Sequence, residues 1–180
     1  MNKWKTLSSR IAYENPYIYV REDAVINPAG QETVYGVVKS KVDGVYIIPI
    51  DAEGNTYLSK QFRYTTESES WECASGRADE KDFEAAAKRE LHEETGVIAK
   101  KLTQLGVIRP ANGCSDFYEV IFLAEDLKVT NDPLDPVDGI LERKKISLED
   151  AIDMVVNGEI ECSQTIAALF MAREYLRRRS

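Results

Sequence analysis

The chain has 180 residues, the size of one ordinary domain, and its 43% hydrophobic and 30% charged residues are typical of a folded globular protein and exclude a disordered one. The formal net charge of −8 argues against a general nucleic-acid binder, because phosphate contacts need a basic surface. No apolar stretch is long enough to span a bilayer or to serve as a secretion signal, and three scattered cysteines suggest no disulfide framework, so we expect a cytoplasmic protein that binds neither membrane nor nucleic acid.

The first third of the chain alternates β-rich segments with turn signals. Asn, Asp and Gly mark turns at residues 27–30, 43–44 and 53–55. The segments around them are rich in Val, Ile and Tyr and cover residues 17–26, 33–42, 44–50 and 56–62. This pattern predicts mostly antiparallel strands.

The next segment, residues 82–95, is predicted to be a helix. Asp82 fits the N-cap position, where a carboxylate accepts from a backbone N–H of the first turn, and Gly96 fits the left-handed position after the helix. Two strand-like segments follow, at residues 106–108 and 117–124.

Two further helices are predicted near the end of the sequence. The first covers residues 147–157, begins with a capping box of Ser147 and Asp150, and ends before Gly158. The second starts near Ser163 and ends with three arginines, which suit the negative end of a helix dipole better than a nucleic-acid patch. Helices that flank strands predict a layered fold of the α/β or α+β class.

The predicted helix at residues 82–95 carries Glu90, Glu93 and Glu94 within about one turn. Residues three and four apart are neighbours on a helix, so like charges repel by about 0.2–0.5 kcal/mol per pair, and the helix dipole is negative at this end as well. Arg89 is spaced to relieve Glu93 alone. A hard divalent cation would relieve the whole group: Mg²⁺, with Mn²⁺ as a substitute, binds through carboxylates and completes its shell with substrate phosphates. The alternative is a solvated acidic helix face.

The stretch that contains this turn, GRADEKDFEAAAKRELHEETGV at residues 76–97, resembles the Nudix box. The family pattern is Gly, five residues, Glu, seven residues, Arg-Glu, a bulky aliphatic residue, any residue, Glu-Glu, any residue, Gly and a bulky aliphatic residue. Its second half matches without a gap at Arg89, Glu90, Leu91, Glu93, Glu94, Gly96 and Val97.

The first half of the box departs from this pattern. Ser75 and Lys81 stand where the family has its glycine and its first glutamate, while the obvious glycine is Gly76. The loop before the helix is therefore one residue short, and Glu80 or Asp82 can substitute for the missing glutamate.

The rest of the chain resembles the subgroup that hydrolyses ADP-ribose and other nucleoside diphosphate sugars. The similar segments, in the order of the family, are residues 8–25, 44–51, 61–64, 71–76, 117–127 and 158–172. The resemblance implies one Nudix domain over residues 1–180, an α/β/α sandwich with a mixed central sheet and an additional N-terminal antiparallel strand region. It also implies a homodimer, in which strands of residues 1–40 reach across the two-fold axis and help to build the substrate site.

The resemblance further implies a set of metal-binding and catalytic residues. Glu90 and Glu94 would ligate the cation directly, together with the backbone carbonyl of Ser75. Glu93, paired with Arg89, would orient the cluster and bind a further ion or its water.

Substrate contacts are implied in the same way. Arg63, in the segment QFRY, would pair with phosphate oxygens through its planar guanidinium. Glu72 would support a metal or ribose contact beside Gly76, whereas Trp71 fits either the core or a stacking surface. The segment RPANGCSD at residues 109–116 replaces the Ser-Pro-Gly of sugar-specific relatives, so the identity of the attached group stays open.

Relatives of this kind often take their general base from a loop near the C-terminal third. Here the loop is residues 126–142, which are acidic and rich in Pro and Gly, and Asp138 and Glu142 are the candidates. A solvated acidic loop is the alternative. His92, the only histidine, is expected to lie on the surface and not to act as a base.

The implied reaction is Mg²⁺-dependent hydrolysis of the pyrophosphate in a nucleoside diphosphate sugar, with ADP-ribose giving AMP and ribose 5-phosphate. Two alternatives stay open. One is another Nudix substrate, either a GDP-sugar or a dinucleoside polyphosphate. The other is a nucleotide-sensing module that has lost catalysis, although the intact run from Arg89 to Glu94 favours an enzyme.

Overall fold

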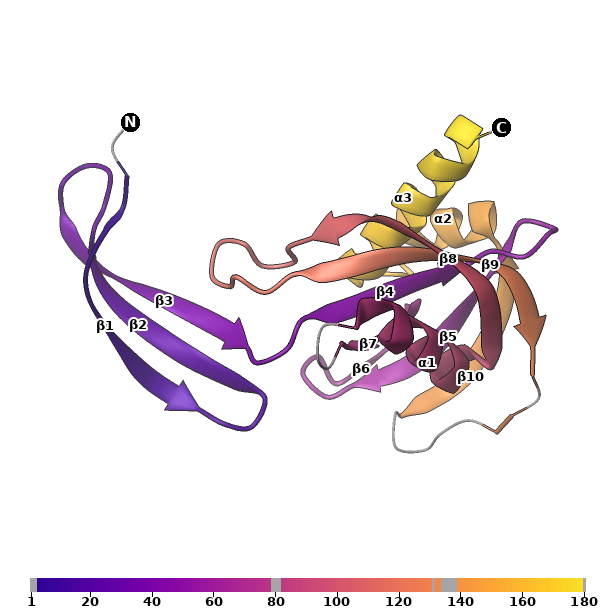
Figure 1. Cartoon of the computed structure of the whole chain (residues 1–180), viewed down its shortest axis with the longest axis horizontal. Helices are drawn as coiled ribbons and strands as arrows, with labels where there is room; N and C mark the ends of the chain where they lie inside the picture. Colours follow the sequence, from indigo (N-terminus) through magenta and orange to yellow (C-terminus); the bar gives the residue numbers. More distant parts are fainter. Residues whose placement is uncertain (1–2, 79–81, 131, 134–138, 180) are drawn as a thin grey trace. The chain divides into compact units, whose positions relative to one another are not determined.

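The computed structural model describes residues 3–78, 82–130, 132–133 and 139–179. The chain divides into two compact units (Figure 1): unit 1 comprises Met1–Asp43 and Arg109–Tyr118, and unit 2 comprises Gly44–Ile108 and Glu119–Ser180. The expected organisation as one Nudix domain over residues 1–180 stays a prediction. Among the described residues, no helix has the length and apolar character needed to cross a membrane.

Unit 1 is built on a three-stranded antiparallel sheet in the order β1-β2-β3. Its strands are β1 (Lys5–Glu14), β2 (Ile18–Ile26) and β3 (Glu32–Ser40). Asn27 shapes the turn between β2 and β3, because its side chain accepts from the N–H groups of Ala29 and Gln31. The predicted N-terminal antiparallel strands are therefore confirmed.

The segment Arg109–Tyr118, which contains the sequence RPANGCSD, also belongs to unit 1. The Val38 N–H of β3 donates to the Cys114 carbonyl at 2.8 Å, and the Tyr35 hydroxyl donates to the Gly113 carbonyl at 2.5 Å. The segment is thus held on β3 through two of its backbone carbonyls.

Unit 2 holds two sheets. The first has the order β7-β4-β9-β8 and is mixed, because β4 runs parallel to β9 while the other pairs are antiparallel. The second is antiparallel, with the order β10-β5-β6. The strands are β4 (Gly44–Pro49), β5 (Asn55–Arg63), β6 (Ser68–Glu72), β7 (Ala74–Arg77), β8 (Val97–Ile108), β9 (Glu119–Val129) and β10 (Ile140–Ser147).

Three helices complete the described part of unit 2: α1 (Phe83–Thr95), α2 (Leu148–Val156) and α3 (Ser163–Arg179). As predicted, Asp82 caps α1 by accepting from the Ala85 N–H, and Gly96 follows the helix with a left-handed φ of 70°. Ser147 caps α2 by accepting from the Asp150 N–H. The predictions of all three helices are confirmed.

The strands of unit 2 lie between two layers of helix (Figure 1). Side chains alternate along β4, so Tyr46 and Ile48 enter the core shared with α2 and α3. Val45 and Ile47 are fully buried on the other face of β4, and α1, with its buried Leu91, also contacts this strand. The predicted α/β/α sandwich with a mixed central sheet is therefore confirmed.

The region between α1 and α2 differs from the sequence expectation. β8 is far longer than the predicted strand at residues 106–108, and β10 is a strand that the sequence pattern did not predict. The predicted loop at residues 126–142 is correspondingly shorter, because its first residues belong to β9 and its last to β10. Charged side chains interrupt the apolar pattern of β8 and β10, and this hides the strands from a hydrophobicity pattern.

Candidate active site

The C-terminal half of α1 directs two carboxylates toward the neighbouring strands. Glu90 and Glu94 are only 9% and 6% exposed, and their spacing of four residues puts them on the same side of the helix. The Glu94 carboxylate accepts from the Ser75 backbone N–H of β7 at 3.1 Å and from the Gln61 amide of β5 at 3.2 Å. Three elements therefore meet at Glu94.

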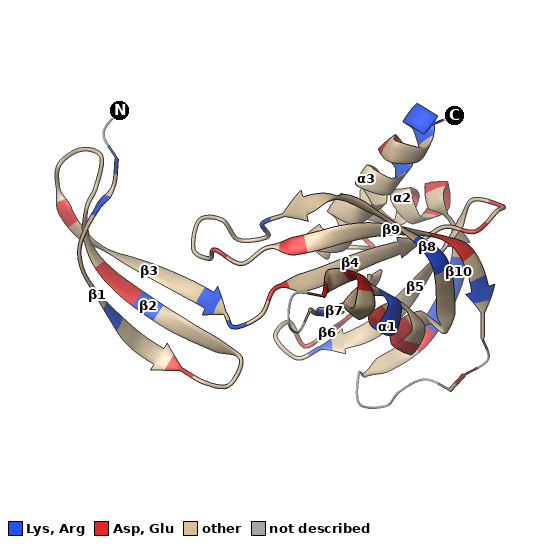
Figure 2. Ribbon diagram, viewed as in Figure 1, with Lys and Arg blue, Asp and Glu red and all other residues tan. Residues whose placement is uncertain are grey.

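Arg89 makes ion pairs with two carboxylates of this turn. It donates to Glu93 at 2.8 Å and to Glu90 at 2.7 Å, and acidic and basic residues accordingly lie close together on α1 (Figure 2). The sequence predicted only the contact with Glu93. The additional pair with Glu90 forms because the arginine has several donors and can also reach its neighbour in sequence. Within the described residues, no cationic side chain makes an ion pair with Glu94.

Of the three carboxylates in the acidic turn, Glu94 is the one that Arg89 does not contact. Burial raises its pKa from 4.5 to about 8, and the negative charge of Glu90 acts in the same direction. The hydrogen bonds from the Ser75 N–H and from Gln61 oppose this rise without cancelling it. A positive charge beside Glu94 would favour the ionised form again.

The residues of this turn fit a divalent cation held by oxygen ligands. Gly76 brings its backbone so close to Glu90 that an added Cβ would overlap the carboxylate. Glu90, Glu94 and the Ser75 backbone offer the hard oxygen donors that Mg²⁺ and Mn²⁺ prefer. Among the described residues, no three acidic, histidine or cysteine side chains converge into a ready-made cage.

Arg63 and Glu72 form a second charged pair, on the β5–β6 hairpin. The Arg63 guanidinium donates to the two oxygens of Glu72 at 2.7 Å and 2.5 Å, and Glu72 is only 3% exposed. This pairing raises the pKa of Arg63 above its ordinary value. The buried carboxylate thus fixes the orientation of an arginine whose other side is open to solvent.

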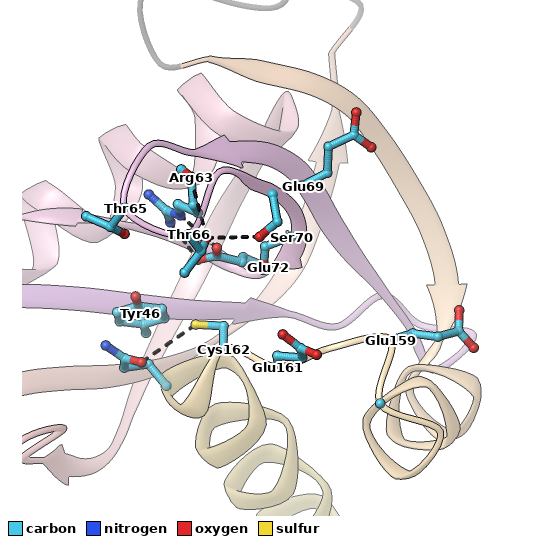
Figure 3. Close-up of a pocket in the computed structure, with 13 residues that line it drawn as sticks. Tyr46, Arg63, Thr65, Thr66, Glu69, Ser70, Glu72, Glu159, Glu161 and Cys162 are labelled. Atoms are coloured by element: carbon cyan, nitrogen blue, oxygen red, sulfur yellow. Dashed lines mark hydrogen bonds and ion pairs between the residues drawn. The ribbon is translucent and has the colours of Figure 1, made fainter.

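A cavity of about 710 Å³ opens beside this pair (Figure 3). It lies between the β5–β6 hairpin, Tyr46 of β4 and the segment that leads into α3. Its charged residues are Arg63, Glu69, Glu72, Glu159 and Glu161. Hydroxyl and amide groups come from Tyr46, Thr65, Thr66, Ser68, Ser70 and Gln164. The cavity is therefore acidic and rich in groups that bond to hydroxyls.

Comparison with known proteins places this site in a family. Residues 40–165 match the family model of the NUDIX domain. The chain belongs to the Nudix family. Residues 4–38 match a second model, the nucleoside diphosphate sugar hydrolase N-terminal domain, so this second match falls on the strands of unit 1.

Similar proteins support the assignment over most of the chain. An ADP-ribose pyrophosphatase of Bacillus subtilis is 30% identical over 167 residues, which cover 92% of this chain and 90% of that protein. An ADP-ribose pyrophosphatase of Mycobacterium tuberculosis is 30% identical over 132 residues, which cover 72% of this chain and 63% of that protein. The crystal structure of an ADP compounds hydrolase, 22% identical, has the same fold with a TM-score of 0.83 and covers 99% of this chain and 96% of its own. The chain is a Nudix pyrophosphohydrolase, and enzymes of this kind generally use divalent metals.

Trp71 lies beside Glu72 on β6 of the Nudix domain but points to the opposite face of the strand. It packs against the hydrophobic core, and the ammonium groups of Lys60 and Lys144 lie 5.9 Å and 5.4 Å from its ring centre. Its ring is therefore directed away from the Glu72 side of the hairpin.

The two candidate bases differ in what the structure says of them. Glu142 lies in β10 and not in a loop, exposed and opposite Lys60 of β5; this corrects the expected loop boundary. Asp138 lies outside the described residues. His92 is partly exposed, as expected for a surface residue, and its Nε2 lies 2.8 Å from the Asp132 carboxylate.

Two buried polar residues of the site were not found from the sequence. Gln61 supports Glu94, as described above. Glu119, at the start of β9, is 9% exposed, and one of its oxygens has no hydrogen-bond partner among the described residues. Burial raises its pKa to about 7, while a hydrogen bond with Gln164 of the cavity opposes the rise. The signal for Glu119 was a charged residue inside the apolar run FYEVIFLA, where an uncompensated charge is costly.

Proposed function

We propose that the enzyme hydrolyses ADP-ribose to AMP and ribose 5-phosphate with Mg²⁺ as its preferred metal and Mn²⁺ as a substitute. The observation that carries the proposal is the connection between two charged groups: Gln61 contacts Glu94 of the acidic turn and lies two residues from Arg63, which lines the cavity. A nucleoside diphosphate sugar needs two neighbouring sites of this kind. Its negatively charged pyrophosphate needs positive charge, and its sugar hydroxyls need hydrogen-bond partners. The activity of the two curated relatives supports the choice of ADP-ribose.

The residues of the chain hold and orient the reacting groups. Gln61 and the Ser75 N–H fix the Glu94 carboxylate, and Arg89 fixes Glu90 and Glu93. When bound by Glu90 and Glu94 with the Ser75 carbonyl, a divalent cation supplies positive charge that offsets the phosphate oxygens and makes water a stronger acid.

Arg63 is proposed to bind the phosphates from the opposite side. Its Nε and Nη2 atoms donate to Glu72, and this pair leaves Nη1 for a phosphate oxygen. Glu72 thereby orients the guanidinium and leaves one of its nitrogens to donate to a second acceptor. Gly76 allows the backbone to approach Glu90, and we propose that substrate passes beside it.

A general base completes the proposal. Asp138 and Glu142 stay the candidates, Glu142 from β10 and Asp138 from outside the described residues. Comparison of the pH–rate profiles of Asp138→Asn and Glu142→Gln distinguishes them, because loss of the base lowers the rate by about 100-fold or more. Two variants with near-normal rates would exclude both.

The acidic cavity bears on the alternative substrates. Its four glutamates and single arginine repel a long polyphosphate chain but accept hydrogen bonds from sugar hydroxyls. This favours a nucleoside diphosphate sugar over a dinucleoside polyphosphate.

The decisive experiment is a turnover screen with purified protein. ADP-ribose, GDP-mannose and diadenosine tetraphosphate are each incubated with Mg²⁺, with Mn²⁺ and with EDTA, and products are identified by chromatography. We expect AMP and ribose 5-phosphate from ADP-ribose, and no products with EDTA. Turnover of GDP-mannose alone would show that the substrate is a GDP-sugar and not ADP-ribose. Binding of these nucleotides without turnover would support the nucleotide-sensing module.

A homodimer is also proposed, on the apolar surface of unit 1. Trp4, Leu7, Ile11 and Tyr13 lie on or next to β1 and are each about half exposed, which is a large apolar surface for a single small sheet. A second copy of the chain would cover it. Light scattering at micromolar concentration tests this, and a monomeric mass would refute it.

A further inference from the structure

The C-terminal end of α1 receives hydrogen bonds from a distant residue. The last four carbonyls of a helix have no partners within the helix. In α1 the Gly96 N–H donates to one of them, the His92 carbonyl, at 2.8 Å. Arg143 of β10 supplies two more: its Nη2 donates to the Glu93 carbonyl at 2.7 Å and its Nε donates to the Glu94 carbonyl at 2.9 Å.

The same guanidinium also holds the segment that follows β9. Its Nη1 donates to the Asp132 carbonyl at 2.9 Å, and the Asp132 carboxylate in turn contacts His92 of α1. Thr130 attaches this segment to the end of α1 a second time, because its N–H and its hydroxyl both contact the Gly96 carbonyl, at 2.7 Å and 3.0 Å. Arg143 therefore joins α1, β10 and the end of β9 at one point.

The contacts of Arg143 set it apart from the surface arginines of the chain. Among the described residues, its three hydrogen-bond acceptors are backbone carbonyls, and it is partly buried, whereas Arg177 and Arg178 are exposed and pair with a carboxylate on their own helix. A guanidinium bound to carbonyls fixes backbone positions. The carbonyls that it fixes belong to Glu93 and Glu94, two of the three carboxylate residues of the acidic turn.

We propose that Arg143 is a positioning residue, which fixes the backbone of Glu93 and Glu94 so that the Glu94 carboxylate holds a divalent cation together with Glu90, while Glu93 stays paired with Arg89. One physical effect supports this role. A small rotation of the last turn moves both carboxylates, and misplacement of a reacting group by about 1 Å costs on the order of 100-fold in rate. The proposal rests on the proposed function only for its effect on turnover; its effect on cation binding is independent.

The test compares Arg143→Met and Arg143→Lys with wild type, and uses Arg173→Met as the matched control. Arg173 is a partly exposed arginine of α3 that pairs with Glu149, outside the acidic turn. Mn²⁺ affinity is measured by titration without nucleotide, followed by electron paramagnetic resonance of the free ion. Turnover of ADP-ribose is measured at saturating Mn²⁺, together with the melting temperature.

We expect Arg143→Met to weaken Mn²⁺ binding by about 10-fold or more, the size seen when a residue that orients metal ligands is lost. The kcat at saturating metal falls by roughly 10- to 100-fold, while KM for ADP-ribose changes little. Arg143→Lys has a single ammonium group in place of the forked guanidinium. Its Mn²⁺ affinity and kcat should therefore lie between those of Arg143→Met and wild type. Arg173→Met matches wild type in both measurements.

The inference is overturned if Arg143→Met only lowers the melting temperature, while Mn²⁺ affinity and kcat stay at the values of Arg173→Met. Arg143→Lys keeps the test decisive if Arg143→Met does not fold, because wild-type Mn²⁺ affinity and kcat in Arg143→Lys would also contradict the role. Absence of ADP-ribose turnover in the wild type would refute the proposed function, and the Mn²⁺ affinities would still decide the role of Arg143.

Discussion

Two helices of the Nudix domain end in opposite ways. The last turn of α3 carries Arg177, Arg178 and Arg179, where positive charge is favourable at the negative end of the helix dipole. The last turns of α1 carry Glu93 and Glu94, where negative charge is unfavourable. The helix that follows the electrostatic rule makes ordinary surface ion pairs, whereas the helix that breaks it is surrounded by Arg89, Arg143 and the Ser75 N–H. We propose that this difference marks the acidic turn of α1 as the place where the protein binds a cation.

Removal of a carboxylate from α1 should have the largest effect. Glu94→Gln keeps the shape of the side chain but removes the charge that we assign to the cation. We expect kcat for ADP-ribose to fall by about 100- to 1000-fold, the effect of losing one preorganised electrostatic group. Steady-state kinetics measure it, with Glu84→Gln, an exposed glutamate of the first turn of the same helix, as a control at the wild-type rate. Retention of Mg²⁺-dependent turnover by Glu94→Gln would contradict the metal assignment.

Substitution of Arg63 should have the next largest effect on activity. Arg63→Lys preserves charge but cannot keep the paired contacts with Glu72 and also reach a phosphate. We expect kcat/KM for ADP-ribose to fall by roughly 10- to 100-fold, equivalent to about 1.4–2.7 kcal/mol. Arg173→Lys on α3 serves as the control. A wild-type kcat/KM in Arg63→Lys would show that Arg63 is only a structural partner of Glu72.

The charge of Glu94 should also be visible in stability. Its pKa rises from 4.5 to about 8 on folding, so the unfolded chain loses this proton before the folded protein does. The free energy of unfolding of the metal-free protein therefore falls as pH rises from about 4.5 to about 8, by an amount on the order of a few kcal/mol. Urea denaturation with EDTA measures the fall, which Glu94→Gln should reduce. Added Mg²⁺ should restore stability at pH 8 in wild type but not in Glu94→Gln.

Glu119 provides the control for that measurement. Its pKa is also raised by burial, to about 7, but it is at the start of β9 and not on α1. Glu119→Gln should likewise reduce the fall in stability, between pH 4.5 and about 7, yet keep the stabilisation by Mg²⁺. Loss of the Mg²⁺ effect in Glu119→Gln would show that the cation does not depend on the α1 turn in the way proposed.

The smallest effect should come from a substitution in the last turn of α3. Arg178→Met removes an exposed ion pair with Glu174 on α3, and exposed pairs contribute little to stability. We expect the melting temperature to change by less than about 2 °C and turnover to stay at the wild-type rate. A large loss of activity would mean that charge at the end of α3 matters as much as charge at the end of α1.

The contrast between the two helix ends also explains what the sequence could reveal. The acidic turn, its caps and Arg89 lie within a single helix, so fixed spacing of three and four residues was enough to predict them. Arg143 and Gln61 reach the site from β10 and β5, and Glu119 lies in β9 beside the cavity residue Gln164; their roles depend on strand pairing and burial that no local pattern encodes. β10 in particular carries four consecutive charged residues, 142–145, after its apolar start, so it resembled a solvated loop. Trp71 could be placed only once the two faces of β6 were known.

The central claim is that the C-terminal half of α1 holds the divalent cation of a Nudix pyrophosphohydrolase. A crystal structure grown with Mn²⁺ and a non-hydrolysable analogue of ADP-ribose tests it directly, because anomalous scattering locates the metal. We predict a Mn²⁺ peak in contact with the carboxylates of Glu90 and Glu94, with the phosphates of the analogue beside it. A Mn²⁺ peak elsewhere on the chain, with both carboxylates free of metal, would contradict the account.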